Sequence, residues 1–303
     1  MSQPKIELLK PREFSELIND TFLFVRQNFK PLVKCFFTFC GFFLVATAAA
    51  MCMQQLRMVE AINSINTFDS ATTRSFSFSS RFAFLGWDYI VAILFTILNY
   101  VTMFVTIFSY IALYREKGNQ APTVEEVWGY IKYYFLRILG ASIVLMILLI
   151  LGFVFCVIPG IYLYPIFTLV APIMIFENTS FGYAFNQSFR LIKEYWWITF
   201  GALFVMSLIA GLSAAVVTAP VAIANVIVML VHGTKDMHMS VPLTLLTVIL
   251  QQLATVLHIL PLVTVALCYF NLTEVKEGTG LMGRIQNFGN PDAPGNDLPA
   301  EEY

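Results

Sequence analysis

Charged residues are scarce in this chain of 303 residues. Asp, Glu, Lys and Arg make up 12% of the sequence, whereas 58% of it is hydrophobic. Soluble domains carry about 25% charged and about 45–50% apolar residues, so the chain lacks the charge that a water-facing surface needs. The formal net charge of −1 also excludes a strongly basic protein, and we therefore expect no nucleic-acid partner.

The sequence also lacks the usual signatures of catalysis and metal binding. It contains no HExxH, GxSxG or Walker motif and no pair of intramembrane aspartates. The five cysteines all lie in apolar segments, form no CxxC pair, and have no metal-type spacing to the three histidines. We therefore expect no enzymatic activity, no metal site and no cofactor.

One long stretch without charge indicates the class of protein. Residues 138–176 contain no Asp, Glu, Lys or Arg, and Pro159–Gly160 lies near the middle of these 39 residues. A single helix of this length would be about 58 Å long, whereas the hydrocarbon core of a bilayer is about 30 Å thick. The stretch therefore predicts two transmembrane helices joined by a turn at Pro159–Gly160.

The other apolar stretches complete an all-α membrane protein with six spans in one domain, residues 1–289. The predicted spans cover about residues 32–56, 89–113, 138–157, 161–176, 197–219 and 243–270. Residues 220–234 follow Pro220 and form either a kinked extension of the fifth span or a separate short segment. Residues 290–303 are rich in Pro, Gly and Asp, which predicts a disordered cytoplasmic tail.

Three amphipathic segments precede the first, third and fifth spans. Residues 11–30, 123–135 and 180–195 place apolar side chains on one helical face, which is typical of helices lying in the membrane interface. Thr123 and Glu126 form a capping box, and Ser180 is expected to cap the third helix. These helices either only anchor the protein or provide a surface for membrane lipids or for a protein partner.

Polar side chains inside predicted spans are candidates for function because they are costly in lipid. Asn99 lies near the middle of the second span, and Gln252 and His258 lie near the middle of the sixth. Two interpretations stay open. The three residues line a polar path through spans two and six, or they form hydrogen bonds between helices, each worth about 0.6–2 kcal/mol.

Three stretches resemble a bacterial membrane family. They are VIPGIYLY (157–164), APIMIFE (171–177) and AFNQSFRLIKEYWWITFG (184–201). The chain is similar there to the membrane-anchor domain beside some glycerophosphodiester phosphodiesterases and to related stand-alone six-span proteins. The residues that carry this resemblance are Pro159, Gly160, Glu177, Ser188, Trp196 and Trp197. The resemblance implies an integral protein of the bacterial inner membrane. It implies no phosphodiesterase activity, because the catalytic domain of those enzymes is a separate soluble barrel.

Two hypotheses for function follow from these patterns. The first is a non-enzymatic membrane protein that anchors, scaffolds or supports membrane organisation through its cytoplasmic interfacial helices. The second is a small-solute or lipid transporter or permease, with Asn99, Gln252 and His258 along its path.

The distribution of basic residues predicts the orientation of the chain. Six spans place both termini on one side, and all 18 Lys and Arg residues except Arg57, Arg74, Arg81 and Lys235 fall on that side. Basic loops face the cytoplasm, so green fluorescent protein fused to either terminus should fluoresce. An alkaline phosphatase fusion that is active at the C-terminus would instead place the two ends on opposite faces.

Overall fold

The computed structural model describes residues 6–67, 87–155, 157–231 and 241–278, whose regular structure is entirely helical. The elements, in chain order, are α1 Phe14–Thr67, α3 Trp87–Glu116, α4 Val124–Phe155, α5 Val157–Thr168, α6 Val170–Phe176, α7 Phe181–Ile192, α8 Trp196–Val231, α9 Val241–Ala254, the 3₁₀ turn η1 Thr255–His258, and α10 Ile259–Glu277. The predicted tail, residues 290–303, lies outside the described residues.

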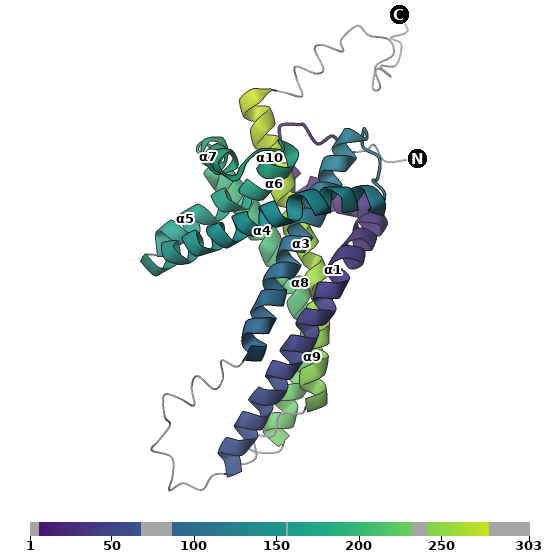
Figure 1. Cartoon of the computed structure of the whole chain (residues 1–303), viewed down its shortest axis with the longest axis vertical. Helices are drawn as coiled ribbons and strands as arrows, with labels where there is room; N and C mark the ends of the chain where they lie inside the picture. Colours follow the sequence, from purple (N-terminus) through teal and green to yellow (C-terminus); the bar gives the residue numbers. More distant parts are fainter. Residues whose placement is uncertain (1–5, 68–86, 156, 232–240, 279–303) are drawn as a thin grey trace, which may run out of the picture.

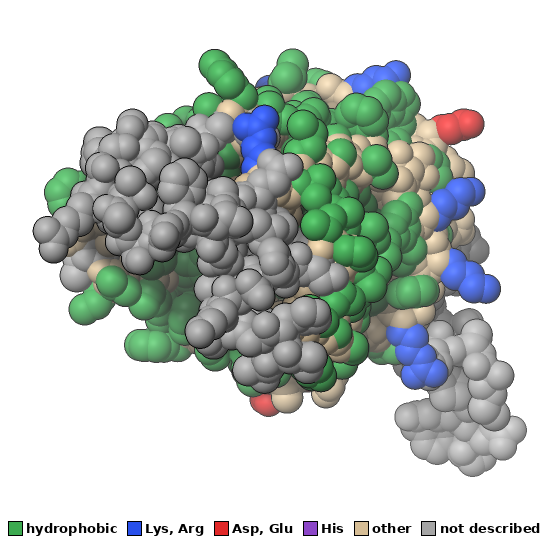
Figure 2. Space-filling model, turned by 90° about the horizontal axis from the view of Figure 1, so that it is seen from below, with side chains coloured by type: hydrophobic (Ala, Val, Ile, Leu, Met, Phe, Trp, Pro, Cys, Tyr) green, Lys and Arg blue, Asp and Glu red, His purple; other side chains and the backbone are tan. Residues whose placement is uncertain are grey.

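Six stretches of these helices are long and apolar enough to cross a bilayer. They are Phe14–Arg57, Tyr89–Glu116, Val124–Phe155, Val157–Phe176, Trp196–Val228 and Val241–Glu277. This confirms the prediction of an all-α, multi-pass membrane protein with six spans. Figure 2 shows hydrophobic side chains over much of the surface seen from below, as expected where lipid rather than water surrounds a protein.

The elements fall into two groups by direction. Helices α1, α3 and α8 and the α9–α10 unit run along the long axis of the molecule (Figure 1). The hairpin of α4 and α5 instead runs across that axis and projects to one side (Figure 1). Much of the projecting part of α4 is exposed, including Ile147, Ile150 and Val154.

Two of the amphipathic segments are continuous with the spans that follow them. Helix α1 contains the segment 11–30 from Phe14 onward and continues through Pro31 to Thr67, eleven residues past the predicted end of the first span. Helix α4 likewise joins segment 123–135 to the third span, because no helix-breaking residue separates them. Only the third segment forms a separate helix, α7, with Ser180 at its N-cap.

The expected capping box at the start of α4 is confirmed. The backbone N–H of Thr123 donates to Glu126 Oε2 over 2.7 Å, and the backbone N–H of Glu126 donates to Thr123 Oγ1 over 3.4 Å. The two bonds satisfy donors that the first turn of a helix otherwise leaves without partners.

The prediction of a turn at Pro159–Gly160 is wrong. Helix α4 ends at Phe155 and α5 begins at Val157, so both residues lie in the first turn of α5. Proline fits there because its missing N–H has no helical partner to lose. Gly160 is buried, and a Cβ atom on it would lie 2.5 Å from Cδ1 of Phe153. Gly160 therefore allows close packing of α5 on α4, and Pro159 lies within the helix rather than in the turn.

The last two spans each contain a proline, with different outcomes. Helix α8 continues past Pro220 to Val231, so residues 220–231 extend the fifth span. The sixth span is interrupted by η1, three residues before Pro261. Pro261 has no N–H to bond the carbonyl of Leu257, which favours a local departure from α-helical geometry.

A buried arginine ties the N-terminal segment to α10. The guanidinium of Arg12 is fully buried and forms an ion pair with Asp20 over 2.7 Å. It also donates to the backbone carbonyls of Leu8, Lys10 and Glu7. The backbone N–H of Arg12 donates to Asn271 Oδ1 over 2.7 Å.

We expect Arg12→Gln to destabilise the protein by about 3 kcal/mol, because removal of one partner from a buried ion pair leaves the other without compensation. Thermal unfolding in a mild detergent measures the loss. Lys10→Gln is the matched control, since its pair with Glu16 is about half exposed and such pairs contribute about 0–1 kcal/mol. Equal melting temperatures for the two variants would contradict the role of Arg12.

Candidate functional site

A cavity of about 380 Å³ lies between α1, α3, α8, α9 and η1, within the transmembrane part of the bundle. The structure places Asn99, Gln252 and His258, the three predicted path residues, on its wall. We call this cavity the polar chamber. Its wall also includes Gln251, Met51, Tyr100, three alanines, and the threonines Thr47, Thr96, Thr218, Thr247 and Thr255.

The break in the sixth span shapes one wall of the polar chamber. Side chains three residues apart in a 3₁₀ turn lie above one another. Thr255 and His258 are at the two ends of η1, and both line the chamber. Irregular backbone at membrane depth is tolerated where it is buried in protein or lines a cavity.

The polar chamber offers hydrogen-bond acceptors to a bound molecule. The hydroxyls of Thr47, Thr96 and Thr247 donate to carbonyls of their own helices over 2.7, 2.7 and 2.9 Å. Each hydroxyl has only one hydrogen, so its oxygen retains acceptor capacity. Asn99 Oδ1 and His258 Nδ1 are buried and form no hydrogen bond of good geometry within the described residues. The chamber therefore suits a molecule that supplies O–H or N–H donors.

Gln252 holds the most readily released donor in the chamber. Its Nε2 lies 3.2 Å from the sulfur of Met51. A thioether is a weak acceptor, so a stronger acceptor on a bound molecule would displace it at little cost. Because its amide has both an N–H donor and a carbonyl acceptor, Gln252 can bind either an acceptor or a donor of a bound molecule.

A second cavity, also about 380 Å³, adjoins the polar chamber and is mainly apolar. Tyr100 and His258 line both cavities, and their ring centroids are 6.1 Å apart in an edge-to-face arrangement. We call this second cavity the apolar chamber. Its walls come from α3, α4, α5, α8 and α10, with Phe104, Phe108, Leu145, Leu149, Phe167 and Leu203 among the lining residues.

Neither chamber is lined by Asp, Glu, Lys or Arg. An ion taken from water into an apolar environment without a partner pays a large desolvation cost. The two chambers together therefore favour an uncharged molecule with one polar and one apolar part.

The residues of the family-like motif lie elsewhere, and none of them lines either chamber. Trp196 Nε1 donates to the carbonyl of Tyr162 over 3.0 Å, which joins α8 to α5, and Trp197 is exposed. The buried hydroxyl of Ser188 donates to the carbonyl of Phe185, within α7. Gly160 packs against Phe153 within the α4–α5 hairpin, and Pro159 is exposed.

Glu177 joins α6 to α10 at the end of the fourth span. Its Oε1 accepts a hydrogen bond of 2.9 Å from the hydroxyl of Tyr269. Burial raises the pKa of Glu177 above its ordinary value, and the nearby Glu277 adds to the increase. Glu177 thus connects helices at the end of the bundle rather than acting in the chambers.

Several chamber residues were not predicted, although the sequence carries a signal for them. Thr96, Asn99 and Tyr100 are spaced three and four residues apart, which places them on one face of α3. Thr247, Gln251, Thr255 and His258 follow a similar spacing along the sixth span. A polar face within an apolar helix is the pattern that would have identified both walls.

No protein-family model, characterised protein or solved structure matches this chain. The resemblance to the membrane-anchor domain of phosphodiesterases therefore stays a prediction. The candidate site consequently depends on the geometry of the two chambers alone.

Asn99→Leu tests whether Asn99 serves structure or function. Asn99 and Asn28 both have 4% of their surface exposed. Asn28 is satisfied, since it donates to the carbonyl of Phe24 and accepts from the hydroxyl of Tyr110, each over 3.1 Å. We expect Asn28→Leu to cost about 1–3 kcal/mol, because it leaves a buried hydroxyl without its partner. Asn99→Leu should change the melting temperature in detergent little or raise it, and a loss as large as that of Asn28→Leu would indicate a structural role.

Proposed function

We propose that this multi-pass membrane protein is a lipid permease for an uncharged amphiphile. The polar group of the substrate enters the polar chamber, and its hydrocarbon part occupies the apolar chamber. The observation that carries the proposal is the junction at Tyr100 and His258, where an acceptor-rich cavity meets an apolar one inside the membrane. A diacylglycerol or a long-chain alcohol has the required chemistry.

Selectivity in this proposal comes from the polar group. A buried acceptor without a partner costs about 1–3 kcal/mol, and a substrate hydroxyl that donates to Asn99 Oδ1 recovers that energy. The hydrocarbon part gains little by leaving lipid for an apolar cavity, because both surroundings are apolar. Its role is to let the substrate enter from the bilayer.

The break in the sixth span offers a means of movement. A stretch of 3₁₀ helix within a long helix often marks a hinge, and η1 connects α9 with α10 beside the polar chamber. A change in the angle between α9 and α10 would open or close the chamber. Discontinuous helices at the substrate site are a recurrent device of membrane transporters.

A second candidate function is an anchor or scaffold without enzymatic activity. Exposed aromatic side chains on the predicted cytoplasmic helices favour it, among them Trp128, Tyr133 and Tyr183. Such a role provides no use for the acceptors of the polar chamber, and we therefore favour the permease. In both cases we place the protein in the bacterial cytoplasmic membrane with both termini inside the cell.

Reconstituted vesicles test the permease directly. The probe is a diacylglycerol with a nitrobenzoxadiazole-labelled acyl chain, and its transfer to the outer leaflet is followed by quenching with external dithionite. We expect Asn99→Leu, Gln252→Leu and His258→Phe each to slow transfer about tenfold, since each removes a polar contact worth about 1–3 kcal/mol.

Ser109→Ala is the matched control for these variants. Ser109 is also on α3, and its buried hydroxyl likewise has no partner in the part of the chain that the structure describes, but it lines neither chamber. We expect transfer at the unsubstituted rate. Unchanged transfer in all three chamber variants would remove the site, and vesicles in which the unsubstituted protein moves no labelled diacylglycerol would contradict the proposed substrate class.

A further inference from the structure

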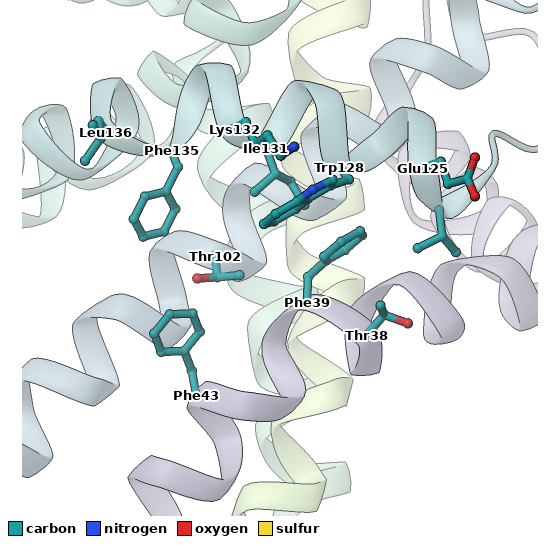
Figure 3. A pocket seen from close by; sticks show the side chains of 11 residues that line it. Thr38, Phe39, Phe43, Thr102, Glu125, Trp128, Ile131, Lys132, Phe135 and Leu136 are labelled. Carbon is teal, nitrogen blue, oxygen red and sulfur yellow. The ribbon is translucent and has the colours of Figure 1, made fainter.

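A separate groove of about 660 Å³ lies where α1 and α4 cross, with α3 behind it. We call it the interfacial groove. Figure 3 shows Phe39 and Trp128 side by side in the middle of the groove, with Phe43, Phe135 and Thr102 on one side of them and Thr38 and Glu125 on the other. None of its lining residues lines the polar or the apolar chamber.

A stacked aromatic pair lies within the groove. The rings of Phe39 and Trp128 are nearly parallel, at 5°, with centroids 5.6 Å apart. Trp128 remains 46% exposed despite this contact. Large apolar side chains next to the groove are exposed as well, with Leu136 at 74% and Phe42 at 72%. In a membrane these side chains face hydrocarbon, so the groove opens toward lipid.

Lys132 and Glu125 both line the groove, and no salt bridge joins them within the described residues. Lys132 Nζ is 5.0 Å from the centroid of the Trp128 ring, and no salt bridge involves Lys132 within the described residues. The exposed Lys34 precedes Thr38 of the groove by one turn, on the same face of α1. Glu125 lies two turns before Lys132, about 10 Å away along α4, beyond the stacked pair (Figure 3).

We propose that the interfacial groove binds one anionic phospholipid of the cytoplasmic leaflet. The phosphate lies against Lys132 and Lys34, and one acyl chain passes between Phe43 and Phe135 into the space in front of Thr102. Tryptophan and lysine are side chains that commonly lie at the level of the lipid headgroups. Polybasic segments attract anionic lipid by about 1 kcal/mol per cation near the surface.

Charge and shape favour a phospholipid over a transmembrane helix of a partner. The groove is about 660 Å³ in volume and lies where two helices cross, whereas a helix with its side chains is about 10 Å wide and needs an open trough along its length. An apolar helix also brings no negative charge to Lys132 and Lys34. An anionic phospholipid provides both the acyl chain that the aromatic walls accommodate and the phosphate that the two lysines attract.

This lipid is distinct from the proposed substrate of the permease. The chambers have no charged side chains and favour an uncharged amphiphile, whereas the interfacial groove is lined by Lys132, which forms no salt bridge within the described residues and attracts an anion. A phospholipid bound in this groove contacts both α1 and α4 and stabilises the packing of the two helices where they cross. Failure of either proposal leaves the other standing, because their tests use different residues and probes.

Quenching of tryptophan fluorescence tests the groove. The chain has four tryptophans, and Trp87→Phe, Trp196→Phe and Trp197→Phe leave Trp128 as the only reporter. In nanodiscs that mix phosphatidylglycerol with phosphatidylcholine, the brominated acyl chain is placed on one lipid or on the other. We expect brominated phosphatidylglycerol to quench Trp128 with about 25-fold preference over brominated phosphatidylcholine, since each of the two lysines contributes about fivefold.

Variants separate a site from general attraction to the membrane. Lys132→Gln should lower the preference for phosphatidylglycerol about fivefold, while Lys132→Arg should retain it. Lys193→Gln, an exposed lysine just after α7, is the control and should leave the preference unchanged. Thr38→Phe should reduce quenching by both lipids, because the added ring occupies the groove.

Two results would overturn the proposal. The first is a preference for phosphatidylglycerol that Lys132→Gln leaves intact, which would mean that the anion binds elsewhere. The second is the absence of Trp128 quenching by either lipid, which would mean that a second copy or another protein covers the groove.

Discussion

Hydrocarbon offers no hydrogen-bond partners, and the structure of this protein depends on that constraint. Every backbone N–H and C=O within the bilayer must be satisfied by the chain itself, which explains why the described residues with regular structure are all helical. The same constraint makes the 3₁₀ turn η1 informative, because it departs from α-helical bonding at the depth of the membrane. The turn η1 lies beside the polar chamber, so the break in the helix and the polar side chains Thr255 and His258 occur at the same place.

Polar side chains within the spans divide into satisfied and unsatisfied groups. Asn28 with Tyr110, and Thr21 with Thr264, are buried pairs that join α1 to α3 and to α10. These contacts hold helices together, which is the ordinary role of a polar residue in a membrane. Asn99 Oδ1 is also buried but has no hydrogen-bond partner among the described residues, and it belongs to the wall of a cavity. Natural proteins retain such costly groups chiefly where function requires them.

Hydropathy and charge were sufficient to predict the six spans and their approximate positions. They also drew attention to Asn99, Gln252 and His258, because polar residues stand out in a chain with so little charge. The turn at Pro159–Gly160 was placed wrongly, since proline is as compatible with the first turn of a helix as with a loop. The continuity of α1 through Pro31 was missed for a related reason, as packing in the bundle outweighs the loss of one hydrogen bond.

The cavities themselves could not be predicted from local patterns. The polar chamber combines side chains from α1, α3, α8, α9 and η1, so its existence depends on how distant helices pack. The groove between α1 and α4 arises because the α4–α5 hairpin runs across the bundle (Figure 1), and hydropathy says nothing about that direction. Sequence periodicity identifies the face of a helix, whereas packing determines what that face meets.

The central claim is that polar molecules reach a chamber inside the membrane, and cysteine labelling tests it most directly. After the five native cysteines are replaced, a cysteine is introduced at Thr218, which lines the polar chamber, or at Ala202, which is fully buried in the same helix. The account predicts that a small, uncharged thiosulfonate reagent modifies the cysteine at position 218 and spares the one at position 202. Equal protection of both positions in folded protein would contradict it.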